Sequence, residues 1–184
     1  MKKIPGLAPL LALTLFAASL PGTADAAHVQ PSSMFVQGGS WSHVESATVG
    51  MTWDWQWQRE FDAGTVTGYT ELDLARWRTR GRPQDEGFNQ FGISPVVRFY
   101  PSAIGHGWYA EGGIGPNWIT PRYHNGGHTF STTFNFGDRI AIGRQFGQDK
   151  SQEVSLGFEH FSNASIKKPN PGENFVQLRY AHRF

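Results

Sequence analysis

The sequence predicts an all-β protein that folds as an eight-stranded antiparallel transmembrane β-barrel. The first observation is the alternation of apolar and polar side chains, clearest from Val49 to Gln58, which has the period of a strand with one apolar face. The second is the number of such segments, since eight is the smallest count that closes a membrane barrel. The third is the terminal Phe184, an ending common among bacterial outer-membrane barrels.

The first four candidate strands lie near residues 31–38, 44–58, 65–79 and 88–100. In the second, Trp53, Trp55 and Trp57 continue the apolar face, and such a tryptophan run resembles an interfacial aromatic girdle. The third is less regular, although its leucines still oppose a polar face. Pro95 in the fourth cannot donate to a strand ladder, so we expect a local irregularity there.

The last four candidate strands lie near residues 107–118, 130–146, 152–163 and 174–184. In the seventh, one face consists of Val154, Leu156, Phe158, His160 and Ser162. In the eighth, one face consists of Val176, Leu178, Tyr180, His182 and Phe184. Both faces have the strict period of two that a strand requires.

The linkers predict how the barrel is oriented. With eight strands both termini lie on the periplasmic side, and long outer loops alternate with short inner turns. The inner turns are near 59–64, 101–106 and 147–151, and the outer loops, longer on average, are near 39–43, 80–87, 119–129 and 164–173. The seventh strand then runs outward, which places His160 and Ser162 at its extracellular end.

Residues 1–26 are predicted to be a cleaved signal peptide, with Lys2 and Lys3, an apolar run and the small-x-small site Ala24-Asp25-Ala26. The remaining segment, 27–184, suits one barrel domain. It carries 14 basic and 14 acidic residues, so the sequence offers no basic footprint for nucleic acid. The chain has no cysteine, which excludes disulfides and thiolate metal sites.

The interior of such a narrow barrel is filled by side chains. We predict that polar packing inside it involves the charged residues Glu71, Asp73, Arg76, Arg98, Glu111 and Arg144.

His160 and Ser162 form a candidate acyl-transfer pair on an apolar, lipid-facing strand surface. Residues two apart on a strand share a face, with Cα atoms about 6.5–7 Å apart, and serine needs a neighbouring base to become a nucleophile. The base needs an orienting acceptor, and Glu173 follows the Pro169–Gly172 turn at the start of the next strand. Asn163 and Asn170, or a backbone N–H group near 164–166, are candidate donors to an oxyanion.

The same residue types also fit a purely structural role. Serine and histidine at a strand end are equally expected where side chains meet water and headgroups. The sequence has no G-x-S-x-G motif, so an α/β-hydrolase is not supported. His124 and His128 would suit a metal only on a helix, and the glycines between them favour a solvated loop, so we expect no metal site.

The segment from His160 to Glu173, His-Phe-Ser-Asn-Ala-Ser-Ile-Lys-Lys-Pro-Asn-Pro-Gly-Glu, resembles the signature of the PagL family, the outer-membrane lipid A 3-O-deacylases. The resemblance extends through 135–140 and more loosely through 111–115, 94–96 and 52–55. It implies an eight-stranded barrel with a lipid-facing Ser-His-Glu triad, in which His160 and Ser162 match the motif.

The acid of the triad departs from the family pattern. One more residue separates the turn glycine from the acid in the family, so an ungapped alignment puts Asn174 at the acid position. Glu173 also has the opposite strand parity to Val176 and Leu178. We predict Glu173 as the acid; either the turn is one residue tighter here or the acid has a weaker role than in the family.

The resemblance implies a serine esterase, without cofactor, that removes the 3-O-linked (R)-3-hydroxyacyl chain from lipid A of lipopolysaccharide in the outer leaflet of the bacterial outer membrane. Lys167 and Lys168 would contact the lipid A phosphates or be exposed charges. Relatives suggest a homodimer, although lipid contact equally explains the tryptophan stripe. Two alternatives are a non-enzymatic barrel in adhesion or envelope structure and a lipid A acyltransferase barrel with catalytic groups facing its lumen.

Overall fold

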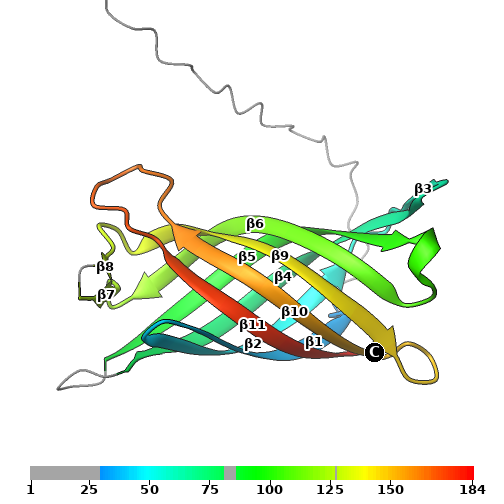
Figure 1. Cartoon of the computed structure of the whole chain (residues 1–184), viewed down its shortest axis with the longest axis horizontal. Coiled ribbons are helices and arrows are strands. Elements are labelled where there is room, and N and C mark those ends of the chain that lie inside the picture. The colour runs from blue at the N-terminus through cyan, green and yellow to red at the C-terminus, as the bar shows by residue number, and fades with distance from the viewer. Residues whose placement is uncertain (1–29, 81–85, 127) are drawn as a thin grey trace, which may run out of the picture.

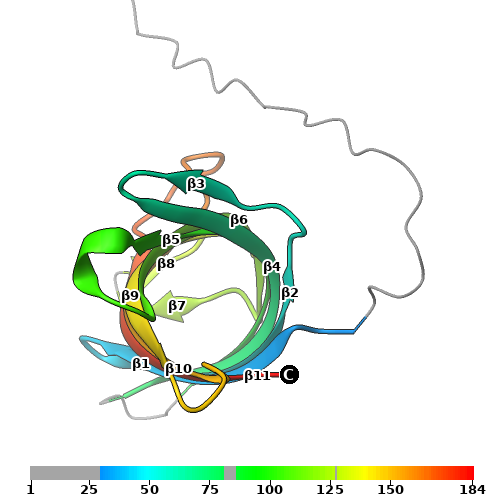
Figure 2. The ribbon, with the colours of Figure 1, turned by 90° about the vertical axis from the view of Figure 1, so that its right-hand side faces the viewer.

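A computed structural model describes residues 30–80, 86–126 and 128–184, and the predicted signal peptide lies outside them. Eight long antiparallel strands pair with their neighbours in chain order, and β1 pairs with β11, so the sheet closes into a barrel (Figure 2). The strands are β1 (Ser33–Trp41), β2 (Val44–Asp54), β4 (Gly64–Thr79), β5 (Gly87–Pro101), β6 (Trp108–Thr120), β9 (Phe134–Phe146), β10 (Gln152–Ser162) and β11 (Glu173–Arg183). The predicted fold class and strand count are confirmed.

The loops between the barrel strands contain short strands and one 3-10 turn. β3 (Arg59–Phe61) pairs with the start of β4, and η2 (Ser102–Ile104) is a single 3-10 turn. β7 (His124–Asn125) and β8 (His128–Thr129) form a small hairpin in the β6–β9 connection. The second strand is shorter than predicted, because the paired ladder of β2 with β4 ends at Asp54.

The loops divide between the two ends of the barrel. In Figure 1 the β7–β8 hairpin and the 163–172 loop lie at the end opposite the C-terminus, whereas β3 lies at the same end as the C-terminus. The loop-rich end is therefore the one that the sequence predicts to be extracellular, and we call it the outer end. β10 runs towards it and finishes there with His160 and Ser162.

The outer wall of the barrel is apolar, as expected for a barrel in contact with lipid. The exposed side chains on it include Val36, Val49, Leu74, Val97, Ile114, Ile140, Ile142, Leu156, Val176 and Leu178. Within the described part of the chain, no helix has the length and apolarity needed to cross a bilayer.

The barrel interior holds a chain of alternating charges. It runs Glu153, Arg98, Glu111, Arg139, Glu71 and Arg179, all buried, with each member hydrogen-bonded to the next. Buried charges are tolerated when they are paired in this way. The wall thus encloses a packed polar core, and no open channel is needed to accommodate the charges.

Two of the predicted interior residues were assigned to the wrong face. Arg76 and Arg144 are exposed on the outer wall, because they share the strand parity of Leu74 and Ile142. The Arg144 guanidinium lies 5.6 Å from the centre of the Trp108 ring. Asp73 faces inward and accepts a hydrogen bond of 2.7 Å from Gln90.

A buried aromatic cluster fills the barrel near its outer end. It comprises Val44, Ala75, Trp77, Phe88, Ile119, Tyr123, Phe130, Phe161 and Phe175. Trp77 lies at its centre, with ring centroids 4.7 Å from both Phe161 and Phe175. These two phenylalanines fix the inward faces of β10 and β11, so the residues beside them in sequence must face outward.

Candidate active site

The outward face of β10 ends in His160 and Ser162, as predicted from its alternation. Leu156 is 54% exposed and Phe158 37% exposed, whereas Phe161, between the two polar residues, is only 2% exposed. His160 and Ser162 are both half-buried. The imidazole and the hydroxyl therefore lie on the lipid-facing wall, at the outer end of the strand.

The His160 ring is oriented by Asn174, its direct partner on β11. Nδ1 of His160 lies 2.7 Å from Oδ1 of Asn174. Because an amide oxygen only accepts hydrogen bonds, Nδ1 must carry the proton and donate it. In the neutral imidazole, Nε2 is then the unprotonated nitrogen, as a general base requires.

The opposite side of the ring is held by the backbone of Gly172. A Cβ atom at this position would lie 2.5 Å from Cε1 and 3.1 Å from Nε2 of His160, and the residue has a φ of 72°. Both the close approach and the left-handed backbone favour glycine. The turn between β10 and β11 thus limits the positions open to the imidazole.

Glu173 does not reach His160, and the expectation that it contacts the imidazole is corrected by the geometry. Its side chain is 4% exposed and faces the barrel interior, where it accepts a hydrogen bond of 2.6 Å from the Tyr123 hydroxyl. It also accepts a hydrogen bond of 3.1 Å from the backbone N–H of Asn174. His160 pairs with Asn174 and the inward-facing Phe161 pairs with Glu173, so strand parity sends Glu173 inward and Asn174 outward.

Asp138 supplies a carboxylate on the other side of His160. It is exposed on β9 and is the direct cross-strand partner of His160. Directly opposed residues of an antiparallel pair have Cβ atoms about 4.5–5.5 Å apart on one face. His160 therefore lies between a neutral amide on β11 and an acidic side chain on β9.

The 163–172 loop follows Ser162 directly and is tied down by Asn163. The Asn163 side chain is 1% exposed, and its Nδ2 donates to the Lys167 carbonyl at 2.8 Å and to the Ser131 hydroxyl at 2.9 Å. Because this side chain is buried and already donates, its role is structural. The geometry does not support it as an oxyanion donor.

The candidate oxyanion donors that remain near Ser162 are the Asn170 amide and the backbone N–H groups of Ala164 and Ser165, because the N–H of Ile166 already donates to the Asn163 carbonyl at 3.0 Å. Oδ1 of Asn170 accepts a hydrogen bond of 2.9 Å from the backbone N–H of Asn163, which leaves the Nδ2 donors for other partners. Ala164 and Ser165 have φ angles of 51° and 63°. These are left-handed backbone conformations, which strain non-glycine residues, and such strain is concentrated at functional sites.

The Ser162 hydroxyl makes no hydrogen bond to any residue that the structure describes. Nucleophile and base are often further apart without substrate than in the reacting complex. Lys167 and Lys168 are exposed in the same loop at the outer end. Their ammonium groups are thus available to an anionic group that lies above Ser162.

A groove in the outer wall ends at His160. It has a volume of 610 Å³ and crosses β5, β6, β9 and β10. Gly112 and Gly113 form part of it, and Ile140 and Phe158 line it beside His160. Most of the groove lining is apolar, and the cross-strand partners Asp138 and His160 lie side by side in it, so the groove suits an acyl chain whose ester lies beside His160.

The described residues contain no cluster of three or more His, Asp or Glu side chains suited to a metal ion. His124 lies in the β7–β8 hairpin and pairs with Glu86 at 2.6 Å, while His128 contacts the Gly172 carbonyl at 3.3 Å. The two histidines thus have separate partners. The hairpin also agrees with the expectation that they lie on a loop and not on a helix.

Sequence reasoning missed Asp138 and chose Glu173 as the partner of His160, where the structure has Asn174. Strand parity contained both signals. Asp138 shares the face of Ile140 and Ile142, just as His160 shares the face of Phe158, and Asn174 shares the face of Val176. Asp138, His160 and Asn174 each continue the apolar outward face of one of three adjacent strands, and this shared parity could have identified them as one site.

Comparisons with known proteins agree with the barrel fold. The family described as lipid A 3-O-deacylase (PagL) matches residues 45–183. The lipid A deacylase PagL of Bordetella bronchiseptica is 30% identical over 79% of this chain and 80% of its own length, and that of Pseudomonas aeruginosa is 29% identical over 72% and 74%. The crystal structure of the outer membrane enzyme PagL superposes with a TM-score of 0.69 at 24% identity, over 83% of this chain and 99% of the other.

Proposed function

The chain belongs to the PagL family of lipid A 3-O-deacylases, and we propose that it is a serine esterase of the outer membrane which removes the 3-O-linked (R)-3-hydroxyacyl chain from lipid A. The observation that carries this proposal is the lipid-facing pair of His160 and Ser162 on β10, with Nδ1 of His160 held by Asn174. A nucleophile on that wall, near the outer leaflet, is accessible to a glycolipid ester.

In the first half of the reaction, Ser162 Oγ attacks the ester carbonyl while Nε2 of His160 accepts the hydroxyl proton. The charge on the carbonyl oxygen would be stabilised by Nδ2 of Asn170 and by a backbone N–H after Asn163. When the tetrahedral intermediate collapses, the sugar 3-oxygen leaves and takes the proton from His160. The hydroxyacyl group is then esterified to Ser162.

In the second half, a water molecule attacks the acyl-enzyme carbonyl and gives its proton to Nε2 of His160. Ser162 Oγ leaves and recovers that proton, which releases the (R)-3-hydroxy fatty acid and the free enzyme. Every proton transfer uses one nitrogen of His160, so neither a metal nor an organic cofactor is required by these steps.

We assign the two tasks of a triad acid to two residues. Asn174 fixes the tautomer and the ring orientation through its hydrogen bond to Nδ1, as the amide does in a Cys-His-Asn triad. Asp138 supplies the negative charge that stabilises the imidazolium. Glu173 acts indirectly, because its buried carboxylate holds the backbone N–H of Asn174.

The groove that ends at His160 would hold the scissile hydroxyacyl chain, and Lys167 and Lys168 would contact the phosphates of lipid A. The hydroxyacyl chain would then lie along the barrel wall, parallel to the other acyl chains of the leaflet. This orientation brings the ester to the headgroup boundary, which is the level of Ser162.

The test is mass spectrometry of lipid A from cells that express either the wild-type protein or Ser162→Ala. We expect the wild type to remove one hydroxyacyl group and the variant to leave lipid A unchanged. A non-enzymatic barrel would leave lipid A unchanged with both proteins. An acyltransferase would add an acyl chain. Either of these results from correctly inserted protein would refute the proposal.

Asn174→Asp is expected to raise the kcat of lipid A deacylation about tenfold. Aspartate has the shape of asparagine, so its oxygen keeps the hydrogen bond to His160 Nδ1, and its charge adds stabilisation of the imidazolium. The measurement is the rate of fatty acid release from lipid A in detergent micelles. Asn174→Leu, which removes the acceptor at similar volume, should lower kcat about tenfold to a hundredfold. Equal rates for all three proteins would contradict the role of Asn174.

Asp138→Asn is expected to lower kcat about tenfold with little change in KM, because the lost charge stabilises only the protonated His160. The effect should shrink in the Asn174→Asp background, where a second carboxylate takes over. The check is a double-mutant cycle on kcat. If the two substitutions act independently, Asp138 does not serve His160.

A further inference from the structure

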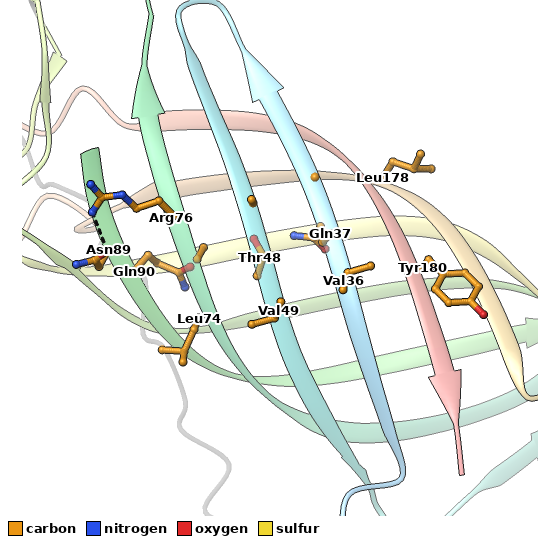
Figure 3. Close-up of a pocket in the computed structure, with 13 residues that line it drawn as sticks. Val36, Gln37, Thr48, Val49, Leu74, Arg76, Asn89, Gln90, Leu178 and Tyr180 are labelled. Atoms are coloured by element: carbon orange, nitrogen blue, oxygen red, sulfur yellow. Dashed lines mark hydrogen bonds between the residues drawn. The ribbon is translucent and has the colours of Figure 1, made fainter. Parts of the chain in front are cut away.

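A second hollow lies in the outer wall, away from the catalytic pair. It has a volume of 870 Å³ and spans β11, β1, β2, β4 and β5. Figure 3 shows Leu74, Val49, Val36, Leu178 and Tyr180 around it, with Arg76 and Asn89 together at one edge. Neither His160 nor Ser162 lines it.

The hollow exists because two adjacent strands carry small residues at the same level. Gly38 on β1 pairs with Ala47 on β2, and they are flanked in register by Leu178 on β11 and Arg76 on β4. A Cβ atom at Gly38 would meet no other heavy atom within 4 Å. The space above this glycine is thus left unfilled by the protein itself.

The edge of the hollow on β4 is cationic. The Arg76 guanidinium donates a hydrogen bond of 2.8 Å to the Asn89 side-chain oxygen (Figure 3). Arg78, two residues further towards the outer end, is exposed on the same face. No ion pair among the described residues involves either arginine. Glu45, the direct cross-strand partner of Arg78, is paired with Arg80, so Arg76 and Arg78 can both meet an anion from outside the chain.

From this combination we infer that the hollow is a second, non-catalytic binding site for intact lipid A. An acyl chain lies over Gly38 and Ala47, and a phosphate is held by Arg76 and Arg78. Arginine is well suited to phosphate, since its guanidinium donates two parallel hydrogen bonds. Lipid A is the occupant because the arginines lie towards the outer end of β4, which faces the leaflet that contains phosphorylated glycolipid.

The site is independent of the deacylase proposal, because binding there involves no reaction. A bound lipid A molecule would occupy the wall where a neighbouring barrel could otherwise pack.

The test uses Ser162→Ala protein in phosphatidylcholine nanodiscs, with native mass spectrometry to count the lipid A molecules retained. The absence of hydrolysis separates this experiment from the deacylation assay. Gly38→Leu places a branched side chain in the hollow, and Arg76→Gln removes one of its two cations. Gly38→Ala is the matched control, because its methyl group has room.

We expect Gly38→Leu and Arg76→Gln each to weaken retention of one lipid A molecule about tenfold, while Gly38→Ala behaves like the parent. Dephosphorylated lipid A should not compete. Equal retention in all variants would overturn the proposal. Equal binding of phosphatidylglycerol would also overturn it, because the site would then be one for anionic phospholipid. A shift of Gly38→Leu from dimer to monomer without loss of lipid would overturn it too, because the hollow would then be an interface with a second copy.

Discussion

His160→Gln is expected to lower the kcat of lipid A deacylation by about 10⁴- to 10⁶-fold. Glutamine keeps a polar side chain on the outward face of β10 but offers no nitrogen that can accept the Ser162 proton. The hydroxyl is then left with no base, and its free nucleophilicity near neutral pH is poor. The measurement is single-turnover release of hydroxy fatty acid from purified lipid A.

The control for this result is His182→Gln. His182 is also exposed on the outer wall but lies on β11 at the other end of the barrel, so its loss should leave kcat unchanged. The double variant of His160→Gln with Ser162→Ala should be no slower than either single variant, because residues that act as one unit lose their effect together. Multiplicative losses would mean that the two residues do not share a proton.

The fold could be predicted from the sequence because each β-strand of a membrane barrel must hide polar groups and expose apolar ones. The period of two in β10 and β11 therefore indicated both the strands and their faces. The end of β2 could not be predicted in this way. The tryptophan alternation continues beyond Asp54, whereas the ladder of β2 with β4 stops at the pair Asp54–Tyr69 and the first residues of β4 pair with β3.

Only those site residues that lie on one strand could be grouped from the sequence. His160 and Ser162 share β10, so their common face follows from spacing alone. Asn174 and Asp138 reach His160 across two different strand pairs, which requires the register of β11 and β9. A shift of one residue in the turn exchanges Glu173 for Asn174 at the imidazole. The signal peptide and the homodimer remain predictions.

Interior charges were harder to assign than apolar faces. An arginine near a strand end suits either the polar lumen or the headgroup region, so composition alone does not distinguish Arg76 from Arg139. The immediate neighbours do, since Arg76 alternates with buried Ala75 and Trp77 whereas Arg139 alternates with exposed Asp138 and Ile140. Strand parity thus predicts whether an arginine faces the interior or the outer wall better than its charge does.

Glu71→Ala is expected to lower the free energy of unfolding by about 3–5 kcal/mol. The Glu71 carboxylate accepts hydrogen bonds of 2.6 Å and 2.9 Å from Arg179 and of 2.9 Å from Arg139. Both arginines are buried, so removing their shared carboxylate leaves positive charge uncompensated inside the barrel. The measurement is equilibrium unfolding by urea in detergent micelles, followed by tryptophan fluorescence.

The matched control is Glu45→Ala, which breaks an ion pair with Arg80 at the outer end. The Arg80 side chain is 68% exposed and that of Glu45 28%, so water and salt screen the pair and its loss should cost about 1 kcal/mol or less. The same chemical change thus has a several-fold larger effect inside the barrel than on its rim. If the two variants lose equal stability, water must solvate Arg139 and Arg179 once Glu71 is removed, and the polar core would contribute little to holding the strands together.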